Sequence, residues 1–136
     1  MKRTFVFQVL LLALTVRTAI AIEAPTGLVS RTGDRSIVLH WERNNEPNLS
    51  GYRVYRSLNN GGPFVAQSPS LVTSLGFCDL SVGVVNGQTN FYQVRAVSTT
   101  AEESLPSATL AAVPHAFASD DEFLEWSGAH DLRPMP

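Results

Sequence analysis

The amino-acid sequence predicts an all-β fold, a small sandwich of seven short strands, and three observations support this prediction. Short runs that alternate apolar and polar residues are separated by clusters of Gly, Pro, Asn and Ser, which is the pattern of strands and turns. A helical period appears only near the end of the chain. The 136 residues, 44% hydrophobic and 16% charged, suit one domain with an ordinary core.

Residues 1–21 are typical of an export signal that is cleaved from the mature protein. The segment begins with two basic residues, continues with an apolar run from Phe5 to Val16 and ends at Ala19-Ile20-Ala21, a small-x-small cleavage pattern. A retained membrane anchor is the alternative, but the apolar run is shorter than the roughly 20 residues that span a bilayer. We therefore expect a secreted protein, extracellular or periplasmic, with membrane contact only if the signal stays uncleaved.

The net charge limits the classes of binding partner, and the cysteine content limits how the fold can be stabilised. Removal of the signal takes away three basic residues, which leaves seven basic against 12 acidic residues and a net charge of −5. Because phosphate binding requires a basic face, we exclude nucleic acid and expect a protein or a polysaccharide as partner. Cys78 is the single cysteine, so no disulfide forms within the chain, and we expect a buried or half-buried side chain in a strand.

The first two predicted strands form the start of the sandwich. The first, about Leu28–Ser30, ends at turn residues 32–34, Thr-Gly-Asp. The second covers Ser36–Trp41, where period-two alternation directs His40 to solvent or to the rim of the sandwich. The same alternation predicts three buried side chains on the opposite face: Ile37, Leu39 and Trp41.

The third predicted strand, Gly51–Ser57, follows a loop at Arg43–Ser50 in which Pro47 prevents a central strand. Tyr52 and Val54 alternate with polar residues and are assigned to the core. The other side of this strand carries aromatic and Arg groups of the kind found at binding hot spots. This candidate binding face consists of Arg53, Tyr55 and Arg56. Ordinary packing and solvation of a strand face is the alternative interpretation.

The remaining predicted strands complete the two sheets. Short strands are expected at Phe64–Ala66 and Gly76–Asp79, and a last strand at Ala108–Ala112. The clearest strand is Thr89–Ser98, which follows the strong turn signal Asn86-Gly87. Its predicted core residues are Tyr92, Val94 and Ala96.

Several segments together resemble a fibronectin type III module. They are residues 24–28 (APTGL), "SIVLHW" ending at Trp41, "LSGYRVYRS" from Leu49 and "NGQTNFYQVRAVS" from Asn86. The resemblance implies a seven-stranded immunoglobulin-like sandwich over residues 22–114, with a role in binding or spacing. The sequence departs from the pattern at Asn90, which stands where a corner tyrosine is usual.

No catalytic machinery is recognisable in the sequence. Neither Cys78 nor any Ser lies in a nucleophile motif, and the histidines at positions 40, 115 and 130 are scattered. The chain has no C-x-x-C or H-x-x-x-H pattern, no calcium loop and no glycine-rich phosphate loop. We therefore predict that the protein is not an enzyme and has no catalytic, metal-binding or cofactor-binding residues.

Residues 115–136 form a tail of different character. Ser119–Glu122 matches a helix capping box, and Phe123, Leu124 and Trp126 follow it. These apolar residues either dock on the sandwich or belong to the truncated start of a following domain, and the rest of the tail is expected to be mostly disordered. The string "FASDDEFLE" from Phe117 is similar to the opening of glucoamylase-like glucan hydrolases, which implies a polysaccharide hydrolase leader.

Three functions follow from these observations. The first is a secreted, non-catalytic interaction or spacer module. The second is a truncated accessory leader of a glucan hydrolase, which rests on the tail. The third is a free-standing adhesion or glycan-binding domain, which rests on Tyr55 and its neighbouring Arg residues. Fold alone does not choose among them.

Overall fold

The computed structural model describes residues 21–127, so most of the predicted signal and the end of the predicted tail, residues 1–20 and 128–136, lie outside the described residues. The described part holds seven strands followed by one helix. Their order along the chain is β1 (Val29–Gly33), β2 (Ser36–His40), β3 (Leu49–Ser57), β4 (Val65–Ala66), β5 (Gly76–Asp79), β6 (Asn90–Ser98), β7 (Leu110–Ala112) and α1 (Asp120–Ser127).

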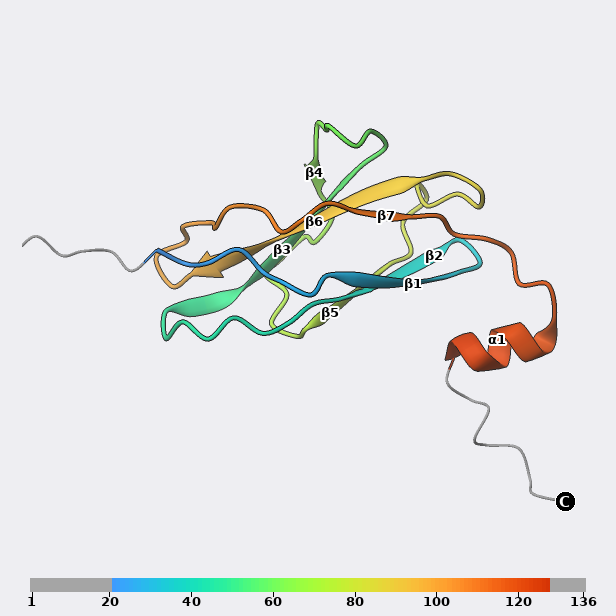
Figure 1. Ribbon diagram of the computed structural model, residues 1–136, viewed down its shortest axis with the longest axis horizontal. Helices are drawn as coiled ribbons and strands as arrows, with labels where there is room; N and C mark the ends of the chain where they lie inside the picture. The colour runs from blue at the N-terminus through green and yellow to red at the C-terminus, as the bar shows by residue number, and fades with distance from the viewer. Residues whose placement is uncertain (1–20, 128–136) are drawn as a thin grey trace, which may run out of the picture.

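The strands form two antiparallel sheets, which confirms the predicted sandwich. One sheet has the order β1-β2-β5 and the other has the order β4-β3-β6-β7. Figure 1 shows β6 and β7 on one side of the molecule and β1, β2 and β5 on the other. Packing the two inner faces together removes apolar surface from water, and this is the main stabilising contribution in a chain without a disulfide.

The core lies between the sheets and follows the alternation of β2, β3 and β6. Cross-strand register pairs Tyr52 with Ala96 and Val54 with Val94, so each pair shares the inner face of its sheet. The Trp41 and Tyr52 rings meet edge to face, with centroids 5.3 Å apart. All the side chains predicted for the core are buried: Ile37, Leu39, Trp41, Tyr52, Val54, Tyr92, Val94 and Ala96. Val84, Val97 and Ala112 are buried as well.

Most strand boundaries differ from the predicted ones by one to three residues, and the differences at β1 and β3 extend the strands. β1 continues through Thr32 and Gly33, and the turn to β2 falls at Asp34 and Arg35, where Arg35 has a φ of 46°. β3 begins at Leu49 because a register shift between Leu49 and Gly51 lets the strand start inside the polar loop. Alternation alone does not reveal a strand end that is fixed by pairing with its neighbour.

The described chain enters and leaves the sandwich at opposite ends of its long axis. Figure 1 shows the first described residues at one end and α1 beyond the β1–β2 turn at the other. The predicted helix start at Ser119–Glu122 is followed by α1, in which the Glu122 N–H donates to Ser119 Oγ at 3.2 Å. Within residues 21–127, the helix α1 is not long and apolar enough to cross a membrane.

The buried Trp41 side chain provides the first prediction. Trp41→Ala is expected to lower the free energy of unfolding by about 3–5 kcal/mol, because it removes a 4% exposed ring and its contact with Tyr52. Chemical denaturation followed by circular dichroism measures the change. Val82→Ala, at a side chain that is 91% exposed, is the control and should change the free energy by less than about 0.5 kcal/mol. Equal stability of the two variants would contradict the core assignment.

Candidate functional site

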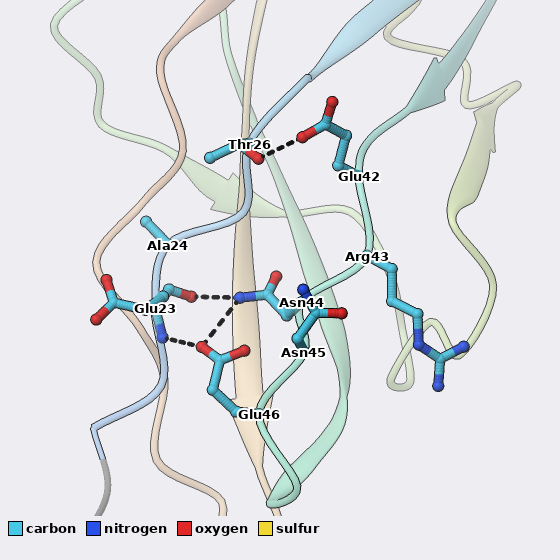
Figure 2. A pocket seen from close by; sticks show the side chains of 8 residues that line it. All are labelled: Glu23, Ala24, Thr26, Glu42, Arg43, Asn44, Asn45 and Glu46. Carbon is cyan, nitrogen blue, oxygen red and sulfur yellow. Dashed lines mark hydrogen bonds between the residues drawn. The ribbon is translucent and has the colours of Figure 1, made fainter.

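A hollow of about 430 Å³ lies between the segment that precedes β1 and the loop that follows β2. Figure 2 shows Thr26 facing Glu42 and Asn44 reaching the Glu23 backbone across it, whereas the Arg43 side chain points away. The loop has this course because Asn and Pro residues favour turns over a continued strand. The lining residues are Glu23, Ala24, Thr26, Glu42, Arg43, Asn44, Asn45 and Glu46.

The polar groups of this hollow bond mainly to one another. The Asn44 amide donates to the Glu23 carbonyl at 2.9 Å and to Glu46 Oε1 at 3.3 Å, and the Thr26 hydroxyl donates to Glu42 Oε2 at 2.8 Å (Figure 2). The Glu23 N–H donates to Glu46 Oε1 at 2.6 Å, and this bond is the main cause that lowers the pKa of Glu46. These contacts fasten the entering chain to the β2–β3 loop.

The hollow does not gather the ligands of a metal site. In residues 21–127, no three His, Cys, Asp or Glu side chains gather closely enough to hold a metal ion. Asn44 is buried, and its N–H donates to the Tyr52 hydroxyl at 3.0 Å, so it also ties the loop to the core. We interpret the contacts of Asn44 with Glu23 and Tyr52 as a structural fastening, which we call the Asn44 latch. Sequence reasoning missed this latch because the segments that it joins are distant in the sequence.

The predicted binding face at Arg53 and Tyr55 lies on the outer side of the four-stranded sheet, around Glu103. Glu103 accepts hydrogen bonds from the Tyr55 hydroxyl at 2.8 and 2.9 Å and forms ion pairs with Arg53 at 3.2 Å and Arg95 at 3.8 Å. The Arg95 guanidinium also lies 5.4 Å from the centre of the Tyr55 ring. Glu103 therefore relieves the repulsion between two Arg residues that stand opposite each other in the sheet.

Arg56, the third residue named for that face, lies on the inner side of β3. Its cross-strand partner is Tyr92, and its side chain is only 14% exposed. Arg56 Nη1 contacts Asp79 Oδ2 at 2.8 Å, and the Tyr92 hydroxyl donates to the same oxygen at 2.9 Å. Asp79 belongs to β5 of the other sheet, so this cluster joins the two sheets.

The cluster of Arg56, Asp79 and Tyr92 satisfies a buried carboxylate. Asp79 is 2% exposed, and its second oxygen accepts the Ser81 N–H at 3.0 Å. Gly83 makes room for the guanidinium, since a Cβ there would lie 2.5 Å from Arg56 Nη2. Burial, followed by the charge of Asp79, raises the pKa of Tyr92 well above that of an exposed tyrosine.

Cys78 is exposed, and the expectation of a buried or half-buried side chain was wrong. Register pairs Cys78 with Val38, which places the thiol on the outer face of the three-stranded sheet. Partial desolvation by neighbouring atoms, followed by the charge of Asp79, raises the pKa of this exposed thiol and disfavours the nucleophilic thiolate. His40 is exposed on the same sheet, while His130 lies outside the described residues.

Comparison with known proteins gives structural neighbours. Neither a protein-family model nor a curated sequence matches the chain. A fibronectin type III-like protein from Clostridium thermocellum has a TM-score of 0.58 and 29% identity, over 74% of this chain and 98% of that protein. The sandwich has a fibronectin type III-like fold.

Two further neighbours are enzymes in which a similar unit forms a minor part. A β-1,2-glucanase from Parabacteroides distasonis matches with a TM-score of 0.63 and 24% identity, over 78% of this chain but 14% of the enzyme. Pectate lyase PelI from Erwinia chrysanthemi matches with a TM-score of 0.53 and 19% identity, over 65% of this chain and 28% of the enzyme. At these identities the similarity establishes the fold alone.

Removing the central carboxylate of the fibronectin type III-like domain provides the second prediction. Asp79→Ala is expected to cost about 3–5 kcal/mol, because it leaves a partly buried Arg56 charge without its partner. Arg53→Ala, at the exposed pair with Glu103, is the matched control and should cost less than about 1 kcal/mol. Denaturant unfolding of both variants measures the difference, and similar small losses would show that Asp79 does not join the sheets.

The raised pKa of Tyr92 provides a third prediction, at alkaline pH. The folded state holds the phenol proton more tightly than the unfolded chain does, so this stabilisation is complete below about pH 10 and declines above it. The free energy of unfolding should therefore fall more steeply above pH 10 in the wild type than in Tyr92→Phe. Parallel pH profiles would contradict the role assigned to the buried phenol.

Proposed function

We propose that this chain is a non-catalytic spacer module of an exported polysaccharide-degrading enzyme. One observation carries the proposal: a β-1,2-glucanase contains a unit similar in fold to 78% of this chain, while the match covers only 14% of that enzyme. The matched share of this chain exceeds the sandwich of residues 22–114 alone. A unit of this size that occurs as a minor part of a larger enzyme is suited to holding another domain in place.

The geometry of the sandwich supports a spacer. The described chain enters at one end of the long axis and leaves at the other, so that neighbouring parts of a protein would be held apart by the length of the module (Figure 1). The Arg56–Asp79–Tyr92 cluster joins the two sheets, and the Asn44 latch fastens the entering chain. Both features join segments that are distant in the sequence, as a spacer that keeps its shape requires.

The alternative of glycan binding through Tyr55 has less support. A sugar stacks on a free aromatic face, but the Arg95 guanidinium lies over the Tyr55 ring and the Tyr55 hydroxyl is bonded to Glu103. The side chains of this face are engaged with one another. We therefore assign the face a role in stabilising the four-stranded sheet.

Replacement within the related glucanase tests the spacer function and is the fourth prediction. In the Parabacteroides distasonis enzyme, the matched unit is exchanged for residues 22–127 of this chain. We expect the chimera to keep a melting temperature and a kcat/KM on β-1,2-glucan close to those of the parent. A deletion variant with a flexible Gly-Ser linker in place of the unit should lose stability.

Two outcomes would reject the proposal, one from the chimera and one from a separate binding assay. A chimera no better than the linker variant would show that this chain does not act as a spacer in that setting. The isolated chain should also fail to bind β-1,2-glucan or polygalacturonate in affinity electrophoresis. Retardation that disappears in Tyr55→Ala would favour the glycan-binding function instead.

A further inference from the structure

The helix α1 rests on β1 at a position that is shaped to receive it. A Cβ at Gly33 would lie 2.8 Å from Phe117 Cζ, 2.8 Å from Ser36 Oγ and 2.9 Å from Trp126 Cε2, closer than side chains approach each other. Gly33 has no positive φ that would require glycine for the backbone. Two of these three atoms belong to aromatic rings from a segment more than 80 residues later in the sequence, and the third belongs to the β1–β2 hairpin itself.

The three described aromatic side chains of this segment form one cluster. The Phe117 ring lies 5.4 Å from the Phe123 ring at an interplanar angle of 71°, and 5.7 Å from the Trp126 ring at 55°. Such edge-to-face and tilted pairs are favourable beyond the area they bury. The cluster covers Gly33 at the end of β1, and the Leu124 side chain lies outside the described part.

Polar contacts hold both ends of the segment. Near its start, the Gly87 N–H donates to the Pro114 carbonyl at 2.8 Å. Glu122 then binds back through two contacts, accepting the Ala118 N–H at 2.6 Å and lying 2.6 Å from His115 Nε2. Near its end, Arg31 Nη2 donates to the Glu125 carbonyl at 2.9 Å, which satisfies a carbonyl of the last helical turn.

We propose that residues 115–127 form a docked joint, in which the surface of β1 at Arg31 and Gly33 binds α1 and fixes the direction in which the chain leaves the sandwich. A segment without such contacts would be a flexible tether, because an isolated helix of eight residues is unstable in water. The joint concerns this chain alone and does not depend on the proposed spacer function.

Spin labels measure the fixed direction in the full chain and provide the fifth prediction. Cys78 is exposed on β5 and offers the first label site, and Glu125→Cys on the exposed side of α1 offers the second. Double electron–electron resonance should give one narrow distance distribution. Phe117→Ala/Trp126→Ala in the same labelled chain should broaden it, because the aromatic contacts with Gly33 are lost. A distribution that is already broad before these substitutions would overturn the joint.

A thermodynamic cycle separates docking from a local defect in the β1–β2 hairpin. Gly33→Ala should lower the melting temperature by about 4–8 °C in the full chain. In the Phe117→Ala/Trp126→Ala background the same change should cost less, since the two rings are gone and only the Ser36 hydroxyl remains close to the new Cβ. Val82→Ala serves as the unaffected control. An equal loss of melting temperature in both backgrounds would show that Gly33 serves the hairpin only and would overturn the docked joint.

Discussion

The Asp79 carboxylate is the point on which the two sheets depend. It is almost fully buried. It pairs with Arg56 of β3 and accepts hydrogen bonds from the Tyr92 hydroxyl of β6 and from the Ser81 N–H just after β5. A buried carboxylate without such partners would be strongly destabilising, so the sheets must keep the relative position that satisfies it. In a chain with one cysteine, this hydrogen-bonded charge pair fixes the sheet arrangement that a disulfide fixes in other sandwiches.

Much of the fold could be predicted from the sequence because period-two alternation is a local signal. Ile37, Leu39 and Trp41 lie on one face of β2 wherever that strand packs, and the turn signals between runs set the number of strands. Strand ends were less predictable, because β1 and β3 extend as far as their neighbours provide hydrogen bonds. Cys78 was misplaced for a related reason, since the register with β2 decides which face a short strand presents.

The side chains of the candidate binding face were harder to place from the sequence than those of the core. Arg56 follows Val54 by two residues, so alternation alone places it inside, but a buried Arg is uncommon without a partner. Its partner Asp79 lies in the other sheet, and no local pattern links them. Glu103 is equally distant from Tyr55, although it decides whether that ring is free. Long-range charge pairing therefore changed the interpretation of a surface that local patterns indicated for binding.

Rigidity is the property that connects these contacts to function. The Asn44 latch holds the entering segment, the Asp79 cluster holds the sheets, and the aromatic seat at Gly33 holds the exit. The Asn44 latch lies at the end where the described chain enters. Asp79 pairs with Ile37, and Ile37 pairs with Thr32, so the Asp79 cluster lies beside Gly33 near the end where the chain leaves. A sandwich that served only to present one binding loop would need specific contacts at that loop alone, whereas the proposed spacer needs them at both ends. The latch at one end, and the Asp79 cluster and the aromatic rings over Gly33 near the other, meet this requirement of the proposal.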